Sequence, residues 1–546
     1  MKISINKSAL ILSLISSIVF DAFLIKKNKE ERKRILVASI IIPVLIIFSS
    51  IFVSGKIYDQ SCDGNYYHKV TIGKLVNGWN PLYEKVEDFN KKGNDVVESS
   101  IANIWVNHYA RGSHVFAANV VSVTNNIETG KSINIISVAA LFLLFMAFIL
   151  YETKDLLMST VFGIVVASCT TITSQILTNY VDILVYVYFF LIILSFFMFE
   201  KLNLFKHKNN YLILFFLALT IGINIKFSLF AYDGIFCLGY YIWYIVRLKK
   251  KQLDKQFFKR FTIVSIVSLI IGVFVIGLSV YPKNFIEKGH PFYPIMGKDK
   301  VDIMTNNQPY YFGKKSTLEK FYIATFSKAE NIIRISKSEA TLKMPFTIYP
   351  EEFYNLSVSD LRMSGNGILF SGILVLSVIL FAIYIFKIYK KDKKLFYLII
   401  IPTVITILLI IFLDESWWAR YFPQLHLIVF FALAILLYNK SKTSIGLLYI
   451  LLTIILLNNY ITLNASLNSS INYTRSVNTQ YYYFDISDKK KQCTLSLYSD
   501  GLDGAFYNII EKENKNKVVV STKKEYESHK EEYNDFMGGY VKWRCK

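Results

Sequence analysis

The sequence predicts an all-α polytopic membrane protein of about twelve transmembrane helices, with extracytoplasmic loops and a small C-terminal α/β domain. Of its 546 residues, 53% are hydrophobic and only 18% are charged, against about 25% charged in average soluble proteins. Many apolar runs reach the roughly 20 residues that cross a bilayer core. Because lipid offers no partner to a free backbone amide, each run is expected to be a helix.

The predicted spans follow from these apolar runs. They are 9–25, 35–54, 132–151, 156–176, 181–199, 211–225, 229–246, 261–281, 367–387, 395–413, 424–438 and 444–463. The first is short and carries Asp21, so whether 9–25 crosses the membrane stays open. If it does not cross, only the side of the N-terminus changes.

Basic residues mark one side of the spans. Lys26–Arg34 holds six basic and two acidic residues, Arg247–Arg260 seven and one, and Lys387–Lys394 five and one. Short loops rich in Lys and Arg are typical of the cytoplasmic side. The formal net charge of +21 is therefore explained by topology, with membrane lipids as partners, and it does not indicate nucleic-acid binding.

With the basic loops in the cytoplasm, the remaining polar regions fall outside. These are a first loop at 55–131, a second loop at 282–366, a turn at 414–423 and the tail. We expect a transmembrane domain at 1–464 and a small extracytoplasmic α/β domain at 465–546. The tail pattern predicts strands at 493–498, 517–522 and 540–544, with helices at 504–514 and 524–535.

The first loop concentrates polar residues in a largely apolar chain, and it is our candidate reaction centre. Asp63 follows the span 35–54 by nine residues. A carboxylate that is partly desolvated beside aromatic rings gains the basicity that a general base needs. The structural alternative is a turn or helix cap, since Asp-Gly is a common turn pair.

The same loop carries three further candidate binding residues. His68 and His108 could bind a metal or relay protons, although no HxxxH or HxH spacing supports a metal site. Arg111 could meet a substrate phosphate or a lipid headgroup.

Two charges fall at the edges of predicted spans. Asp182 and Lys226 call for explanation, because a charge at bilayer depth is costly and usually faces an interior cavity. Snorkelling toward the interface is the structural alternative for Lys226. We treat both as candidate substrate-binding residues.

The turn at 414–423 is the densest polar cluster at any span boundary. Arg420 suits a phosphate, because its planar fork pairs with two phosphate oxygens. Trp417 and Trp418 could stack on a sugar ring or anchor the chain in the membrane interface. Anchoring would explain the tryptophans but not the arginine.

Five short motifs follow one another along the outer side of the chain. They are Asp63 with Tyr66–His68 and Gly78–Tyr83, then Gln175–Asp182, Asn224–Ser228, Gly289–Pro294 and Trp417–Pro423. In this order they resemble the GT-C superfamily of integral-membrane glycosyltransferases, of the polyprenyl-phosphate-sugar-dependent type. The motifs extend from about residue 60 to residue 425, and the tail beyond 465 carries none.

The resemblance implies a transferase in a bacterial cytoplasmic membrane, with its active face outside. It implies a polyprenyl-phosphate-sugar donor and a cell-envelope glycan, lipid or protein acceptor. It also makes Asp63 the catalytic base, with the phosphate held by Arg420 and Lys226. The family often has two adjacent acids at this point, whereas Gly64 follows Asp63 here. The sequence establishes no cofactor, and a divalent metal stays open.

Two other functions stay open at this stage. A polysaccharide polymerase or ligase acting on lipid-linked oligosaccharides would depend more on His108 or His290 than on Asp63. A transporter or flippase would favour broken helices and polar residues at mid-bilayer, in two similar halves. This chain places its polar residues in outer loops and shows no internal repeat.

Overall fold

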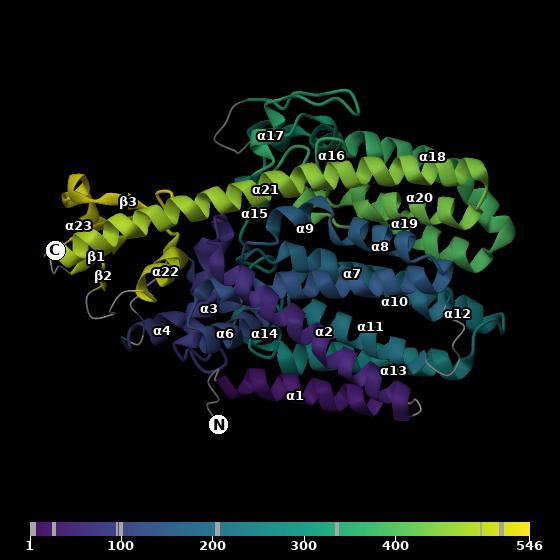
Figure 1. The fold of residues 1–546 in the computed structure, drawn as a ribbon, viewed down its shortest axis with the longest axis horizontal. Helices are drawn as coiled ribbons and strands as arrows, with labels where there is room; N and C mark the ends of the chain where they lie inside the picture. Colours follow the sequence, from purple (N-terminus) through teal and green to yellow (C-terminus); the bar gives the residue numbers. More distant parts are fainter. Residues whose placement is uncertain are drawn as a thin grey trace.

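The computed structural model describes residues 7–24, 29–93, 95, 97, 102–201, 208–332, 338–491, 494–512 and 518–545. Within these residues the chain is a bundle of helices with a small sheet domain at one end (Figure 1). Eight of the described helices are long and apolar enough to cross a membrane, and three shorter helices are apolar. Together with the first helix, they account for all twelve predicted segments.

The bundle follows the predicted order. Its helices are α1 (Lys7–Leu24), α2 (Lys29–Lys56), α7 (Ser132–Thr153), α8 (Leu156–Ala167), α10 (Asp182–Lys201), α11 (Lys208–Ile223), α12 (Phe227–Lys249), α13 (Lys255–Ile270), α18 (Phe370–Lys391), α19 (Lys393–Phe412), α20 (Leu425–Asn439) and α21 (Lys442–Lys491). A π-helical turn, η3 (Ile271–Ile276), continues α13. The chain is therefore a multi-pass membrane protein.

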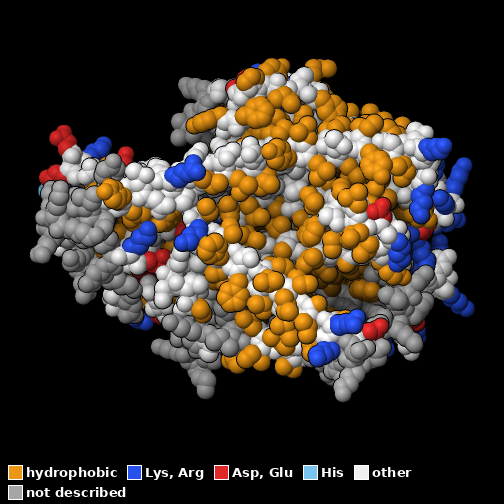
Figure 2. All heavy atoms as spheres, viewed as in Figure 1, with side chains coloured by type: hydrophobic (Ala, Val, Ile, Leu, Met, Phe, Trp, Pro, Cys, Tyr) orange, Lys and Arg blue, Asp and Glu red, His pale blue; other side chains and the backbone are white. Residues whose placement is uncertain are grey.

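The surface has the distribution of side chains that a membrane requires. Figure 2 shows apolar side chains covering the middle of the bundle, with a dense group of Lys and Arg at the end opposite the sheet domain. Helix α10 lies at the centre, since 94% of the residues in its apolar stretch are buried within the protein. It begins at Asp182, so the most buried helix places a carboxylate at its own N-terminus.

One predicted span is broken. The segment 156–176 forms α8, which ends at Ala167, and a separate short helix, α9 (Thr170–Gln175). The break lies at Ser168 and Cys169, where the Ser168 hydroxyl accepts from Nδ2 of Asn459 on α21; hydroxyl side chains are typical of helix ends. The turn after α9 leads directly to Asp182.

The last span is longer than predicted. Its helix, α21, does not end at 463 but extends from Lys442 to Lys491, 50 residues in all, and Figure 1 shows it reaching the sheet domain. No Gly or Pro interrupts residues 464–491, so nothing in that segment stops the helix. The sheet therefore begins 30 residues after the expected domain start at 465, at Leu495.

The tail forms the predicted small α/β unit. Its elements are β1 (Leu495–Tyr498), η7 (Asp503–Ala505), α22 (Phe506–Ile510), β2 (Val518–Val520), α23 (Lys523–Ser528), η9 (Lys530–Glu532), β3 (Asn534–Phe536) and β4 (Val541–Cys545). The strand order is β2-β1-β4-β3, with β1 parallel to β2 and antiparallel to β4. Strand β3 was not predicted, since we expected a helix over 524–535.

Short helices fill the outer loops. The first loop contains η1 (Gly64–His68), α3 (Lys69–Val76), α4 (Val86–Asn90), α5 (Asn103–His108), α6 (Gly112–Thr124) and η2 (Ile127–Lys131). The second loop and the later turn contain α14 (Tyr281–Lys288), α15 (Ile303–Asn307), η4 (Tyr310–Lys314), α16 (Thr317–Phe326), α17 (Glu352–Asn355), η5 (Asp414–Trp417) and η6 (Ala419–Tyr421). Both loops lie at the same end of the bundle (Figure 1).

Candidate active site

A cavity of about 470 Å³ lies where the two outer loops, the start of α12 and the 414–421 turn meet. Its charged lining residues are Asp63, Lys226, Asp360, Arg362, Glu415 and Arg420. Part of its wall is apolar, formed by Phe227, Ala231, Ile295, Ile303, Met304 and Leu413. The cavity can therefore hold a molecule with a charged part and an apolar part.

Arg420 is the centre of the charged lining. Its Nη2 donates to Oδ2 of Asp63 at 2.6 Å, and its Nε lies 3.1 Å from Oδ2 of Asp182. Its Nη1 lies 3.7 Å from Oδ2 of Asp360. One guanidinium thus connects three carboxylates that are distant in the sequence. Arg420 is only 7% exposed.

Lys226 provides a second cation beside this cluster. Its Nζ is paired with Asp182 and lies 4.1 Å from the centre of the Tyr421 ring. Lys226 is also the N-cap residue of α12. The first amides of a helix lack intrahelical partners and attract anions. Lysine, arginine and helix N-terminus together form a site suited to a phosphate.

Asp63 follows the irregular segment 58–61 and is the N-cap residue of η1, with helical backbone angles. The residue after it is closely packed against that segment. A Cβ added to Gly64 would lie 2.2 Å from Oδ2 of Asp59 and 2.3 Å from Oγ of Ser61. Only glycine fits at position 64, because the carboxylate of Asp59 already occupies that space. This explains why no second acid follows Asp63.

Burial changes the acidity of two groups in the lining. Burial raises the pKa of the Asp360 carboxyl, against the opposing charges of Arg420 and Arg362. Burial, assisted by the charges of Asp63 and Asp360, raises the pKa of the Cys62 thiol to about 11. The cavity therefore disfavours a negative charge that has no cation beside it. It accepts a negative charge that pairs with Arg362, Arg420 or Lys226.

The tryptophan pair supports the arginines. Trp417 and Trp418 stack with their ring centres 5.4 Å apart and 7° between their planes. The guanidinium groups of Arg362 and Arg420 lie 4.9 and 4.8 Å from the Trp418 ring centre. Trp418 lines the cavity, whereas Trp417 packs edge-to-face on Phe312, away from it.

The other three candidates of the first loop do not line the cavity. Nδ1 of His68 lies 2.7 Å from Nε2 of His114, and Nδ1 of His108 lies 2.8 Å from Oδ1 of Asn284. Arg111 donates to the backbone carbonyls of Val106 and Ser279 and stacks on Trp79. The His68 contact stays within the first loop, whereas His108 and Arg111 connect this loop with the segment 279–284. A direct role in substrate binding stays a prediction for all three.

The structure also brings in two residues that the sequence reasoning missed. Asp360 and Arg362 lie at the end of the second loop, just before α18, and both line the cavity. An acid and an arginine two positions apart at a span boundary were the signal that could have found them. In the described part of the chain, no group of three or more His, Cys, Asp or Glu is arranged to hold a metal ion.

The fold and site define a multi-pass membrane protein with a charged cavity at the outer-loop end of its helical bundle. No protein-family model and no curated protein matches the chain. Its structure is similar to ArnT from Cupriavidus metallidurans bound to undecaprenyl phosphate, with a TM-score of 0.50 and 9% identity over 88% of this chain and 89% of that chain. The apo structure of ArnT gives a TM-score of 0.44 at 9% identity, over 87% and 84% of the two chains. The chain thus has an ArnT-like fold.

Proposed function

We propose that the protein is a membrane glycosyltransferase that moves a sugar from a polyprenyl-phosphate carrier to a cell-envelope acceptor. The observation that carries the proposal is Arg420, which sits with Asp63 and Lys226 in one cavity although they are far apart in sequence. The bound undecaprenyl phosphate of ArnT, a protein of similar fold, supports a polyprenyl phosphate as the carrier.

In the proposed reaction, Asp63 accepts the proton of an acceptor hydroxyl while the hydroxyl oxygen forms a bond to the anomeric carbon. The bond from that carbon to the phosphate oxygen breaks, and its electron pair leaves with the polyprenyl phosphate. Arg420, Lys226 and the N-terminus of α12 stabilise the negative charge that grows on that phosphate. The apolar wall of the cavity accommodates the beginning of the lipid chain.

The orientation and location are part of the proposal. The end of the bundle that is rich in Lys and Arg lies opposite the sheet domain (Figure 2). Loops rich in Lys and Arg are typical of the cytoplasmic side. We therefore assign the cavity to the extracytoplasmic face of a bacterial cytoplasmic membrane. A disulfide at Cys545 in the tail domain is in keeping with an oxidising compartment.

The two rival functions gain little support from the site. A polymerase or ligase that depends on His108 or His290 would place those side chains at the reaction centre, and neither lines the cavity. A transporter or flippase predicts movement of a lipid-linked substrate with no covalent product. Assays of vesicle uptake and product formation distinguish it from a transferase.

Transfer of labelled sugar from defined polyprenyl-phosphate sugars by the purified protein tests the proposal. We expect Asp63→Asn to reduce kcat by about 10²-fold or more, because a general base contributes about 10²–10⁴-fold. Asp88→Asn is the matched control, since Asp88 is an exposed acid of the first loop. Transfer by Asp63→Asn at the wild-type rate would show that Asp63 is not the base.

A further inference from the structure

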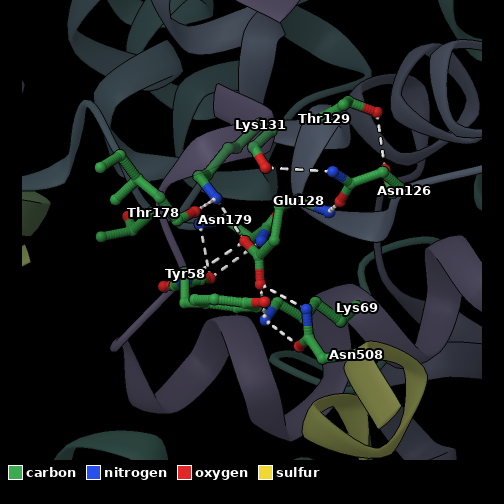
Figure 3. Close-up of polar contacts among 12 residues, drawn as sticks. Tyr58, Lys69, Asn126, Glu128, Thr129, Lys131, Thr178, Asn179 and Asn508 are labelled. Atoms are coloured by element: carbon green, nitrogen blue, oxygen red, sulfur yellow. Dashed lines mark hydrogen bonds and ion pairs between the residues drawn. The ribbon is translucent and has the colours of Figure 1, made fainter. Parts of the chain in front are cut away.

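The first outer loop contains a buried charge cluster outside the cavity (Figure 3). Glu128 accepts from Nζ of Lys69 at 2.6 Å and is also paired with Lys131. The side chains of the two lysines are 0% exposed, and that of the glutamate is 2% exposed. A buried charge that loses its partner is strongly destabilising. The positions of these three side chains relative to one another are therefore tightly fixed.

A residue of the tail domain completes this cluster. Asn508, on α22, donates through Nδ2 to Oε1 of Glu128 at 2.8 Å. Its Oδ1 accepts from Nζ of Lys69 at 2.9 Å. Asn508 is 3% exposed, so both of its side-chain polar groups are used to join the tail domain to the first loop.

The cluster continues to Asp59, four residues before Asp63. The amide of Asp59 donates to Oε2 of Glu128 at 3.1 Å. The carboxylate of Asp59 accepts from the amide of Ser61 at 2.8 Å, and from the amide and Nδ2 of Asn179 at 2.8 and 2.9 Å. Asp59 therefore fastens the turn before Asp63 to the turn before Asp182, and both of these acids pair with Arg420.

The tail domain touches this same segment at other points. The hydroxyl of Tyr540 donates to the carbonyl of Gln60 at 2.7 Å. A Cβ on Gly504 would lie 2.6 Å from the carbonyl oxygen of Asn65, so the two backbones are in close contact. The tail domain thus packs directly against the residues on both sides of Asp63.

We propose that the tail domain is a positioning element of the active site, acting through Asn508, Glu128 and Asp59 on the turn that carries Asp63. This inference rests on the proposed function for its kinetic test. None of the three side chains lines the cavity, so they act by fixing where Asp63 lies relative to Asp182 and Arg420.

The first test is Asn508→Ala in the full-length protein, with kcat and the donor KM measured separately. We expect kcat to fall about tenfold or more while KM changes less than about twofold, because misplacement of a reacting group by 1 Å can cost about 10²-fold. Asn534→Ala is the matched control, since Asn534 is an exposed asparagine of the same domain. Its kcat is expected to equal that of the wild type.

A charge exchange provides the rescue. Glu128→Gln leaves the two lysines in excess, and Asn508→Asp adds a negative charge beside Glu128. The double variant restores the charge balance. The side-chain amide introduced at position 128 then donates to the carboxylate introduced at position 508. We expect the double variant to exceed the weaker single variant in kcat by about fivefold, as coupled neighbours do.

Alkylation of Cys62 gives a readout that needs no donor. Cys62 is a free thiol that reagents can reach from the cavity beside Asp63, and its raised pKa makes its alkylation slow and therefore sensitive to a shift of this segment. Cys169 is buried and serves as an internal control. A displaced turn changes the rate of maleimide labelling at Cys62 in Asn508→Ala. If wild-type protein transfers no sugar, the proposed function fails and the labelling rate still decides this inference.

Two results would overturn the inference. One is an Asn508→Ala protein with both the wild-type kcat and the wild-type labelling rate at Cys62. The other is a loss of folded protein that accounts for all of the lost activity, with no recovery in the double variant.

Discussion

Replacement of Arg420 by lysine separates its charge from its geometry. The guanidinium reaches Asp63 at 2.6 Å, Asp182 at 3.1 Å and Asp360 at 3.7 Å. A lysine ammonium keeps the positive charge, but it lacks the fork that reaches several oxygens at once. Alanine would be a poor choice, because an uncompensated buried carboxylate costs about 3–5 kcal/mol of stability.

The expected magnitude follows from the loss of one fixed donor to the leaving phosphate. Such a donor contributes about 2.7–4 kcal/mol to transition-state stabilisation, which corresponds to about 10²–10³-fold in kcat. We expect Arg420→Lys to lose activity in that range, with a thermal midpoint in detergent close to the wild type. Because the charge remains, the donor KM is expected to change much less than kcat.

The assay is the rate of labelled-sugar transfer at saturating donor, with purified protein in detergent. Arg475→Lys on α21 is the matched control, because Arg475 is exposed and does not line the cavity. A kcat for Arg420→Lys within about threefold of the wild type would refute the argument that the fork is needed. A raised KM with unchanged kcat would assign Arg420 to uniform binding instead.

Three further outcomes are expected. Asp360→Asn leaves the arginines less neutralised, so the donor KM should fall, and a rise would contradict this. Trp418→Leu removes the ring that supports two guanidinium groups, so kcat/KM should fall about tenfold, while Trp417→Leu, away from the cavity, should lose less. Burial lowers the pKa of His114 from 6.5 to about 3, so the stability from its neutral form is present above pH 6.5 and is lost as pH falls toward 3. The free energy of unfolding should therefore decrease by about 1.4 kcal/mol per pH unit below 6.5. The thermal midpoint should fall from pH 7 to pH 5, and His114→Gln should flatten this decrease.

The architecture could be predicted because a bilayer constrains the chain so strongly. An apolar run of about 20 residues has one stable solution in lipid, a helix. A hydropathy pattern does not show where the helix within an apolar run is broken or where it ends. It missed the break after Ala167 and the continuation of α21 beyond 463, where the residues become polar but the helix does not end.

Candidate site residues could be chosen from the sequence where a charge lay at a span boundary or in a dense polar segment, and their roles stay predictions. Asp182 and Lys226 stood out because they occupy span boundaries, and the structure pairs them with each other. Asp360 and Arg362 were missed because they were counted with the other charges of a long polar loop, although their place near the start of α18 is the same kind of signal. Asp59 could not be predicted either, because its role depends on contacts with Asn179, 120 residues away.

The charge balance of the cluster indicates how a donor would free the base. Asp63, Asp182 and Asp360 all pair with Arg420, so a phosphate that binds this guanidinium takes the place of one of them. The side chain of Asp182 is only 2% exposed and is also paired with Lys226, so its release would leave a buried charge without water. Asp360 is already 3.7 Å from Arg420, so its release would free no hydrogen-bond donor of the guanidinium for the phosphate. Asp63 makes the shortest contact, and its side chain is the most exposed of the three at 24%. A phosphate that takes over the Nη2 donor of Arg420 would therefore release Asp63 into the cavity with its oxygen free to accept a proton, so that donor binding itself prepares the base.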